Sequence, residues 1–333
     1  MNDHHPRPLG INNISNDETQ ISVSTSLPAL PHSTPPIITS PDTSAAKVGP
    51  SNLRLRVIWG VLGAALLLGS VWFSPWTFGL FFAAVQAVML WEFYRMMRAG
   101  GYAPATWLGV GAGLLIFWCF SRTVAAFGYQ VLLDRWEDTL FPSLLVLMVL
   151  PVVLLLWEVY KWSGPSSAKS PFADIGTTLA GVFYVSLPMS LLHIIAYGGH
   201  YDYRRIFALL FLIWASDIGA YAAGKTFGKH KMAPKISPGK TWEGWAGGFL
   251  LTLVVGWAIG FMLPDMPLTH RLVAAGVVAI FAPLGDLAES MLKRSVGVKD
   301  SGRILPGHGG LLDRFDAFLL VLPVLALLQL LAG

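Results

Sequence analysis

Acidic and basic side chains recur at helical spacing in the last third of the chain. Asp286, Glu289 and Lys293 are separated by three and four residues, so on a helix they share one face. Asp313 and Asp316 repeat the acidic spacing. Carboxylate oxygens suit Mg²⁺, which typically binds one or two protein carboxylates together with substrate phosphates. Lys and Arg side chains nearby would neutralise those phosphates, so the set favours transfer at phosphorus.

A second charged segment, residues 224–244, holds five lysines, four glycines and two prolines. Glycines let backbone N–H groups approach an anion, and ammonium groups neutralise its charge. The segment therefore predicts a flexible cationic loop that wraps a polyphosphate. Gly219 to Thr226 formally matches the Walker pattern, but it follows an apolar helix rather than a strand, which argues against a Walker loop.

The elements that must position these residues are membrane helices. The chain has 333 residues, of which 54% are hydrophobic and only 13% are charged, and a soluble domain carries about twice that charge. Each apolar block approaches the roughly 20 residues that a helix needs to cross a bilayer. We expect an all-α, polytopic membrane bundle of about nine spans, near residues 53–73, 76–97, 105–126, 140–160, 174–197, 205–224, 241–263, 271–292 and 314–332.

Three regions are expected along the chain. Residues 1–50 contain eight Pro, seven Ser and five Thr without a sustained apolar run, which predicts a disordered tail. Residues 51–204 supply the N-terminal spans. Residues 205–333 form the catalytic region, because the charged motifs are confined to it. The single cysteine, Cys119, is interpreted as a packing residue.

Basic residues set the expected orientation. If nine spans alternate, one face receives the tail and the loops after the second, fourth, sixth and eighth spans, with 18 of the 23 basic residues. The positive-inside rule then places the N-terminus and both charged loops in the cytoplasm. The other face keeps only Arg122, Arg135, Arg204, Arg205 and Arg271.

Acidic residues lie at comparable depth in three of these helices. Asp217 is roughly 12 Å along its helix from Lys225, and Asp286 is roughly 10 Å from Lys293. With Asp313, they would gather near the cytoplasmic face, where buried charge is costly unless it serves a function. Glu92 near Arg95 and Glu158 near Lys161 are instead interpreted as interfacial ion pairs.

The last charged stretch carries a family resemblance. Ser290 to Asp316 resembles the signature of the phosphatidate cytidylyltransferases. The matching positions are Ser290, Lys293, Arg294, Lys299, Asp300, His308, Gly309, Gly310, Asp313, Arg314 and Asp316. Residues 217–244 are also similar to that family, including Ile236-Ser237-Pro238 and Lys240-Thr241-Trp242-Glu243-Gly244, although Ala222 stands where an aromatic is expected.

The resemblance implies that CTP and phosphatidate give CDP-diacylglycerol and pyrophosphate, with Mg²⁺ and a possible second cation as cofactors. It implies a multi-pass protein of the inner membrane in contact with membrane lipid, a plausible homodimer, and no nucleic-acid partner. The metal ligands would be Asp286 and Asp313, then Asp217, Glu289 and Asp316. The catalytic set would be Asp286, Asp313, Lys293, Arg294 and His308. Substrate binding would fall to Ser237, Lys240, Lys299, Asp300, Arg303, Arg314 and Lys229.

Two other functions fit parts of the pattern. A CTP-dependent lipid kinase of the polyprenol type would use similar groups but release CDP. A cytidylyltransferase that acts on another anionic lipid is a further enzymatic alternative of this kind. A cation-coupled transporter would use intramembrane carboxylates to bind its coupling ions. Transporters often carry internal repeats, and here the charged motifs occupy one end of the chain only.

Overall fold

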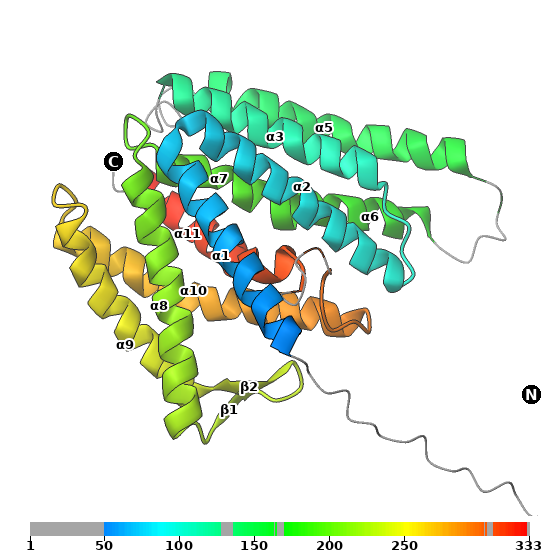
Figure 1. Ribbon diagram of the computed structural model, residues 1–333. Coiled ribbons are helices and arrows are strands. Elements are labelled where there is room, and N and C mark those ends of the chain that lie inside the picture. The colour runs from blue at the N-terminus through cyan, green and yellow to red at the C-terminus, as the bar shows by residue number, and fades with distance from the viewer. Residues whose placement is uncertain are drawn as a thin grey trace, which may run out of the picture. The chain divides into compact units, whose positions relative to one another are not determined.

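The computed structural model describes residues 50–127, 136–162, 164, 170–302, 304 and 309–331. Almost all of them are helical (Figure 1). The predicted tail, apart from Pro50, lies outside the described residues. The helices in chain order are α1 (Pro50–Phe73), α2 (Pro75–Ala99), α3 (Thr106–Phe127), α5 (Trp136–Lys161), α6 (Pro171–Gly181), α7 (Leu187–Ala196), α8 (Tyr203–Phe227), α9 (Trp242–Ala258), α10 (Leu268–Ser295) and α11 (Leu312–Leu331).

The all-α membrane architecture is confirmed. Eight helical stretches in the described part of the chain are long and apolar enough to span a bilayer. The predicted first span corresponds to α1, whose stretch Val57–Phe73 is apolar but shorter. Helix ends differ from the predicted ones by up to five residues; α9, for example, ends at Ala258 and α5 starts at Trp136.

The predicted span 174–197 is built from three consecutive pieces. Between α6 and α7 the chain widens into a π-helical turn, η1 (Val182–Ser186). The N–H of Leu187 donates to the carbonyl of Val182, five residues back. Pro188 has no N–H to offer the carbonyl of Tyr184, which favours the wider turn. Such turns inside helices are rare and frequently lie at functional sites.

Helix α11 joins two groups of helices. It packs against α10 on one side and against α7 and α2 on the other, while α3 packs against α2, α5 and α7. Figure 1 shows α11 between α7 and α10 in this way. The C-terminal region, residues 205–333, is therefore in contact with the N-terminal spans, and residues from both parts can reach one site.

Helices α8 and α9 approach each other closely through small residues. A Cβ atom added to Gly219 would lie 2.8 Å from the carbonyl oxygen of Gly247. Because this is too close for a real Cβ contact, only glycine fits at this position. Small residues at such crossings are the usual means by which membrane helices approach. The start of α9 is thereby held beside the Asp217 turn of α8.

The segment predicted as a flexible loop is instead an ordered hairpin, which corrects the sequence-based interpretation. Strands β1 (Lys231–Ala233) and β2 (Ser237–Thr241) are antiparallel, with Lys231 opposite Thr241 and Ala233 opposite Ser237. Two side chains at the start of α9 fix its base. The Thr241 hydroxyl caps α9 by accepting from the N–H of Gly244 at 3.1 Å, as N-cap threonines do.

Glu243 completes this anchor. Its Oε2 accepts from the backbone N–H of Lys229 at 3.1 Å, and both carboxylate oxygens accept from the N–H of His230 at 3.2 Å. Because these groups bind the backbone of the hairpin's first residues, the lysines are carried on a fixed frame rather than on a free chain.

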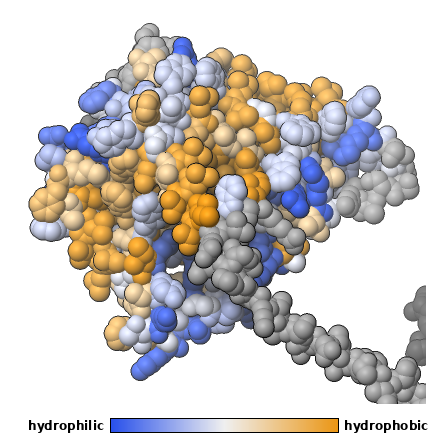
Figure 2. All heavy atoms as spheres, in the orientation of Figure 1, coloured by the Kyte–Doolittle hydropathy of each residue, from blue (hydrophilic) through white to orange (hydrophobic). Residues whose placement is uncertain are grey.

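The outer surface suits a lipid surrounding. Large apolar side chains such as Phe73, Trp107 and Phe261 are more than four-fifths exposed, an arrangement that water would penalise. Figure 2 shows hydrophobic surface across the middle of the molecule and hydrophilic residues toward the hairpin end. The chain is therefore a multi-pass membrane protein.

Candidate active site

The hairpin delivers Lys240 to the middle of α10. Its ammonium donates to Oδ2 of Asp286 at 2.8 Å and to the carbonyl of Pro283 at 3.0 Å. Pro283 has no N–H, so the carbonyl of Ala279 has no helical partner. The indole N–H of Trp245 donates to that carbonyl at 3.1 Å. One proline in α10 thus creates a polar attachment point for α9, beside the place where Lys240 reaches Asp286.

Asp286 is also the meeting point of α8, α10 and α11. Asp217 of α8 lies near enough to interact electrostatically with Asp286 and with Lys240. The Asp316 carboxylate of α11 lies against that of Asp286, within reach of a side-chain hydrogen bond. The predicted gathering of carboxylates from separate helices is therefore present in the structure.

A glycine allows α10 and α11 to come this close. A Cβ atom on Gly285 would lie 2.6 Å from the carbonyl oxygen of Asp316 and 2.9 Å from the Cα of Ala317. These are distances at which backbone would have to move. Gly285 therefore sets the separation of the helices that carry Asp286 and Asp316.

Lys293 ties together the other two acidic residues. Its ammonium donates to Oδ1 of Asp313 at 2.7 Å and to the carboxylate of Glu289 one turn away. Lys293 and Glu289 are buried. Asp313 also accepts from the backbone N–H groups of Gly310, at 2.9 Å, and Ser301, at 3.2 Å. Asp313 thus anchors the chain segments on either side of the last loop to the buried Lys293.

These seven side chains, here called the carboxylate cluster, form one connected group. Its members are Asp217, Lys240, Asp286, Glu289, Lys293, Asp313 and Asp316. With every carboxylate ionised, five negative charges face two positive ones. An excess of negative charge among packed membrane helices requires cations from elsewhere or protonation. The cluster is therefore suited to a cationic cofactor or to a substrate bound together with one.

The fit to Mg²⁺ is uneven across the cluster. Among the described residues no three His, Cys, Asp or Glu side chains are arranged as a complete metal site. Asp286 and Asp316 offer a pair of facing carboxylates, and a protein pair completed by substrate phosphates is a common way of holding Mg²⁺. The Asp313 oxygens already accept hydrogen bonds from Lys293, Ser301 and Gly310. Asp313 is therefore less well suited to be a metal ligand.

Tyr184 is a residue that the sequence pattern did not single out. The π-helical turn carries it toward the carboxylate cluster, where it interacts electrostatically with Glu289, Asp316 and Asp286. Its hydroxyl is buried and has no hydrogen-bond partner among the described residues. An unpaired buried hydroxyl costs free energy, and this one is available as a donor near the acidic group. The signal available in the sequence was Pro188, which favours a π turn.

Glu92 corrects one sequence-based interpretation. It is fully buried rather than interfacial, and its Oε2 accepts from the N–H of Leu312 at 2.8 Å. Gly302 and Gly310 pack against the same carboxylate. Glu92, on α2, therefore binds the first residue of α11. Arg95 lies instead over the ring of Trp91.

The ion pair predicted between Glu158 and Lys161 is confirmed, because Oε1 of Glu158 lies 3.3 Å from the Lys161 ammonium.

The remaining predicted site residues lie around the cluster's loops. Ser237 is half-buried in β2, and Lys229 is exposed just before β1. Arg294, Lys299, Asp300 and Arg314 are exposed at the end of α10, in the following loop and at the start of α11. The structure gives no contact between the Arg294 side chain and the cluster; its Nη1 donates to the carbonyl of Val298. Arg303 and His308 lie outside the described residues.

Comparisons with known proteins identify the family to which this chain belongs. A profile of the cytidylyltransferase family matches residues 54–331. A phosphatidate cytidylyltransferase of Bacillus subtilis is 34% identical over 277 residues, which cover 82% of this chain and 96% of the relative. One from Haemophilus influenzae is 33% identical over 293 residues, which cover 81% of this chain and 96% of the relative. One from Staphylococcus aureus is 40% identical over 189 residues, covering 56% and 71%.

The match extends from α1 to α11 and includes every helix that contributes to the carboxylate cluster. Both bacterial relatives that are covered almost completely carry the same name. This chain therefore belongs to the cytidylyltransferase family.

Proposed function

We propose that this protein transfers the cytidylyl group of CTP to phosphatidate and so forms CDP-diacylglycerol and pyrophosphate. The observation that carries the proposal is the convergence of α8, α10, α11 and the hairpin on one cluster of carboxylates and lysines. The near full-length relatives named phosphatidate cytidylyltransferase support it. A multi-pass protein has access to the lipid substrate within the bilayer.

In the proposed reaction an oxygen of the phosphatidate phosphate attacks the α-phosphorus of CTP. The bond from that phosphorus to the bridging oxygen of the β-phosphate breaks, and its electron pair leaves with pyrophosphate. The attacking oxygen is already an anion, so the step needs little base catalysis. What it needs is alignment and neutralisation of charge.

Lys240 and Lys293 are the residues best placed for charge neutralisation. Lys240 lies near the end of strand β2, where its ammonium donates to Asp286. If one of its N–H groups donated to a phosphate oxygen of the substrate instead, Lys240 would stay charged and paired. Lys293 is held in place by Glu289 and Asp313, so its ammonium is a positive charge at a fixed position. We assign nucleotide and lipid phosphate binding to Lys229, Ser237, Lys299, Asp300, Arg303 and Arg314, and we keep Arg294 and His308 as catalytic candidates.

We further propose that the cluster holds Mg²⁺ through Asp286 and Asp316, with Asp217 beside them. The proposal is supported by the facing pair of carboxylates and by the excess of negative charge. When bound, the ion would supply charge neutralisation at phosphate oxygens. Glu289 and Asp313 are proposed for a second cation site, where a bound ion would replace part of the contacts that Asp313 makes with Lys293, Ser301 and Gly310.

The proposed setting is the inner membrane, with the N-terminus and the carboxylate cluster on the cytoplasmic side. The distribution of basic residues supports this orientation, and the relatives are bacterial. A homodimer is proposed from the family resemblance alone. Cross-linking in native membranes would test it, with a species of twice the monomer mass expected.

Radiolabelled CTP distinguishes the proposed reaction from its alternatives. The purified full chain is incubated with phosphatidate and with CTP labelled at either the α- or the γ-phosphate, in Mg²⁺ or in EDTA. We expect the α-label to enter the lipid in Mg²⁺ and the γ-label to appear in pyrophosphate. Transfer of the γ-label to lipid would identify a kinase. Ion flux into liposomes without consumption of CTP would identify a transporter.

A further inference from the structure

A cavity of about 500 Å³ lies at the opposite end of α8 from the carboxylate cluster. It is bounded by the turn before α8, the start of α8, the connection from α9 to α10 and the end of α11. Arg205, on its wall, is twelve residues from Asp217 along one helix, which corresponds to roughly 18 Å. The cavity is therefore separate from the proposed active site.

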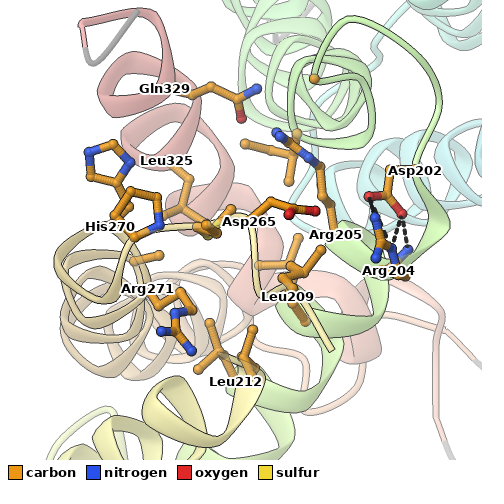
Figure 3. Close-up of a pocket in the computed structure, with 18 of the residues that line it drawn as sticks. Asp202, Arg204, Arg205, Leu209, Leu212, Asp265, His270, Arg271, Leu325 and Gln329 are labelled. Atoms are coloured by element: carbon orange, nitrogen blue, oxygen red, sulfur yellow. Dashed lines mark hydrogen bonds and ion pairs between the residues drawn. The ribbon is translucent and has the colours of Figure 1, made fainter. Parts of the chain in front are cut away.

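The walls of this cavity combine cationic and apolar groups. Figure 3 shows Arg205, Asp265, His270 and Arg271 around one opening, with Leu209 and Leu212 beside them. Arg204 is already paired, because its guanidinium donates to both carboxylate oxygens of Asp202, at 3.0 and 2.9 Å. Arg205 also interacts electrostatically with Asp202, and Arg204 with Asp265. Three arginines thus face two carboxylates, and the cavity keeps a net positive charge.

Two of the arginines have donors to spare. The Arg205 guanidinium makes no hydrogen bond to any described residue; it lies over the turn at Gly198. Arg271 donates from Nη1 to the carbonyl of Trp257 at 3.1 Å, but its Nε is buried and has no partner in the described part of the chain. Unpaired guanidinium donors beside an apolar wall are suited to a phosphate group.

The location of these arginines strengthens the inference. The positive-inside rule depletes basic residues from one face of a membrane protein. Arg204, Arg205 and Arg271 are three of the five basic residues assigned to that face, and all three line this single cavity. Such a concentration on the depleted face indicates a specific anionic partner.

The apolar surroundings point to a lipid as the source of that anion. Val273 lines the cavity and is half exposed on the lipid-facing surface. Ile259 borders both the cavity and a neighbouring groove between α8 and α9, whose lining is entirely apolar and includes Phe211, Val255 and Phe261. An acyl chain attached to a bound headgroup would have this apolar groove next to it.

We propose that this cavity binds the phosphate headgroup of an anionic phospholipid from the leaflet opposite the carboxylate cluster, with an acyl chain against its apolar wall. Basic pockets between membrane helices bind lipid headgroups in this manner. The site is independent of the proposed transfer reaction and would make the protein responsive to lipid on the side away from its own substrates.

The test measures lipid binding to the purified full chain in a neutral detergent, by native mass spectrometry. Phosphatidylglycerol is the anionic probe and phosphatidylcholine the zwitterionic one. We expect tighter retention of phosphatidylglycerol, and Arg205→Gln should weaken it about tenfold, as expected for loss of a charged hydrogen bond. Arg122→Gln is the matched control, because Arg122 is assigned to the same face but lies outside the cavity.

Three further measurements make the result decisive. Val273→Trp, which adds bulk at an exposed part of the wall, should also weaken retention and covers the case in which Arg205→Gln fails to fold. Asp286→Asn should leave phosphatidylglycerol binding unchanged, since that residue belongs to the other site. Inorganic phosphate should not displace the lipid.

Equal retention by wild type, Arg205→Gln and Val273→Trp would overturn the proposal, as would loss of binding in Asp286→Asn. Displacement by inorganic phosphate would overturn the lipid assignment in favour of a free-anion site.

Discussion

Gly285 of α10 lies against the backbone of Asp316 in α11, so close that a Cβ atom would fall 2.6 Å from the Asp316 carbonyl oxygen. Asp286 follows Gly285 directly and faces the Asp316 carboxylate. Because Gly285 has no side chain, the two proposed metal ligands Asp286 and Asp316 can lie this close together.

Replacing this glycine should therefore impair activity more than stability. In Gly285→Ala the two helices must move apart, and a displacement on the order of 1 Å at a reacting centre costs about a hundredfold in rate. Cytidylyl transfer is measured beside thermal stability in detergent. Gly276→Ala, on the same helix with open space around it, should keep wild-type activity. Similar rates for both variants would contradict the role assigned to Gly285.

Removing the buried cation of the cluster should destabilise the protein. Lys293→Met leaves Glu289 and Asp313 without their shared partner. Breaking a buried ion pair from one side costs about 3–5 kcal/mol. Adding Glu289→Gln removes one uncompensated charge, so the double variant should recover part of the melting temperature but none of the transfer activity. An unchanged melting temperature in Lys293→Met would contradict the buried pairing.

Tyr184 and Tyr94 should respond oppositely to loss of their hydroxyl groups. The Tyr94 hydroxyl donates to the carbonyl of Thr178 at 2.8 Å, so Tyr94→Phe should cost about 1 kcal/mol of stability and little activity. The Tyr184 hydroxyl has no described partner but interacts electrostatically with Glu289, Asp316 and Asp286 of the cluster. Tyr184→Phe should keep its stability and lose about tenfold in rate, the value of one hydrogen bond to a charged group. Full activity in Tyr184→Phe would remove it from the site.

Glu92 is expected to act as a positioning residue. Glu92→Ala leaves the buried N–H of Leu312 without an acceptor, at a cost of about 1–3 kcal/mol. Glu92→Gln keeps a carbonyl oxygen for that N–H and should retain most of the activity. Hydrogen exchange at the Leu312 amide reports the contact directly. It should accelerate in Glu92→Ala and stay slow in Glu92→Gln, whereas equal protection in both would show that the contact is unimportant.

The sequence predicted the spans and the C-terminal part of the site because those signals are local. Apolar length identifies a membrane helix, and helical spacing places Asp286, Glu289 and Lys293 on one face of α10. The order of the hairpin was missed, since Gly, Pro and Lys suggest a flexible loop. Its order comes from Thr241 and Glu243, which bind backbone groups of the residues around it.

Glu92 and Tyr184 could not be placed from sequence for a different reason. Each meets the site across more than a hundred residues of chain, through the packing of α11 against α2 and α7. Glu92 has a basic residue within one turn, so an ordinary ion pair was the natural expectation. Only the three-dimensional arrangement reveals that its partner is the backbone of Leu312.

The central claim is that the carboxylate cluster performs cytidylyl transfer. The most direct measurement compares incorporation of α-labelled CTP into phosphatidate by wild type and Asp286→Asn, in matched proteoliposomes with Mg²⁺. Asp286 contacts Lys240 and faces Asp316, so the variant should incorporate almost no label while extracting from the membrane as a folded protein. Incorporation by Asp286→Asn at the wild-type rate would contradict the account.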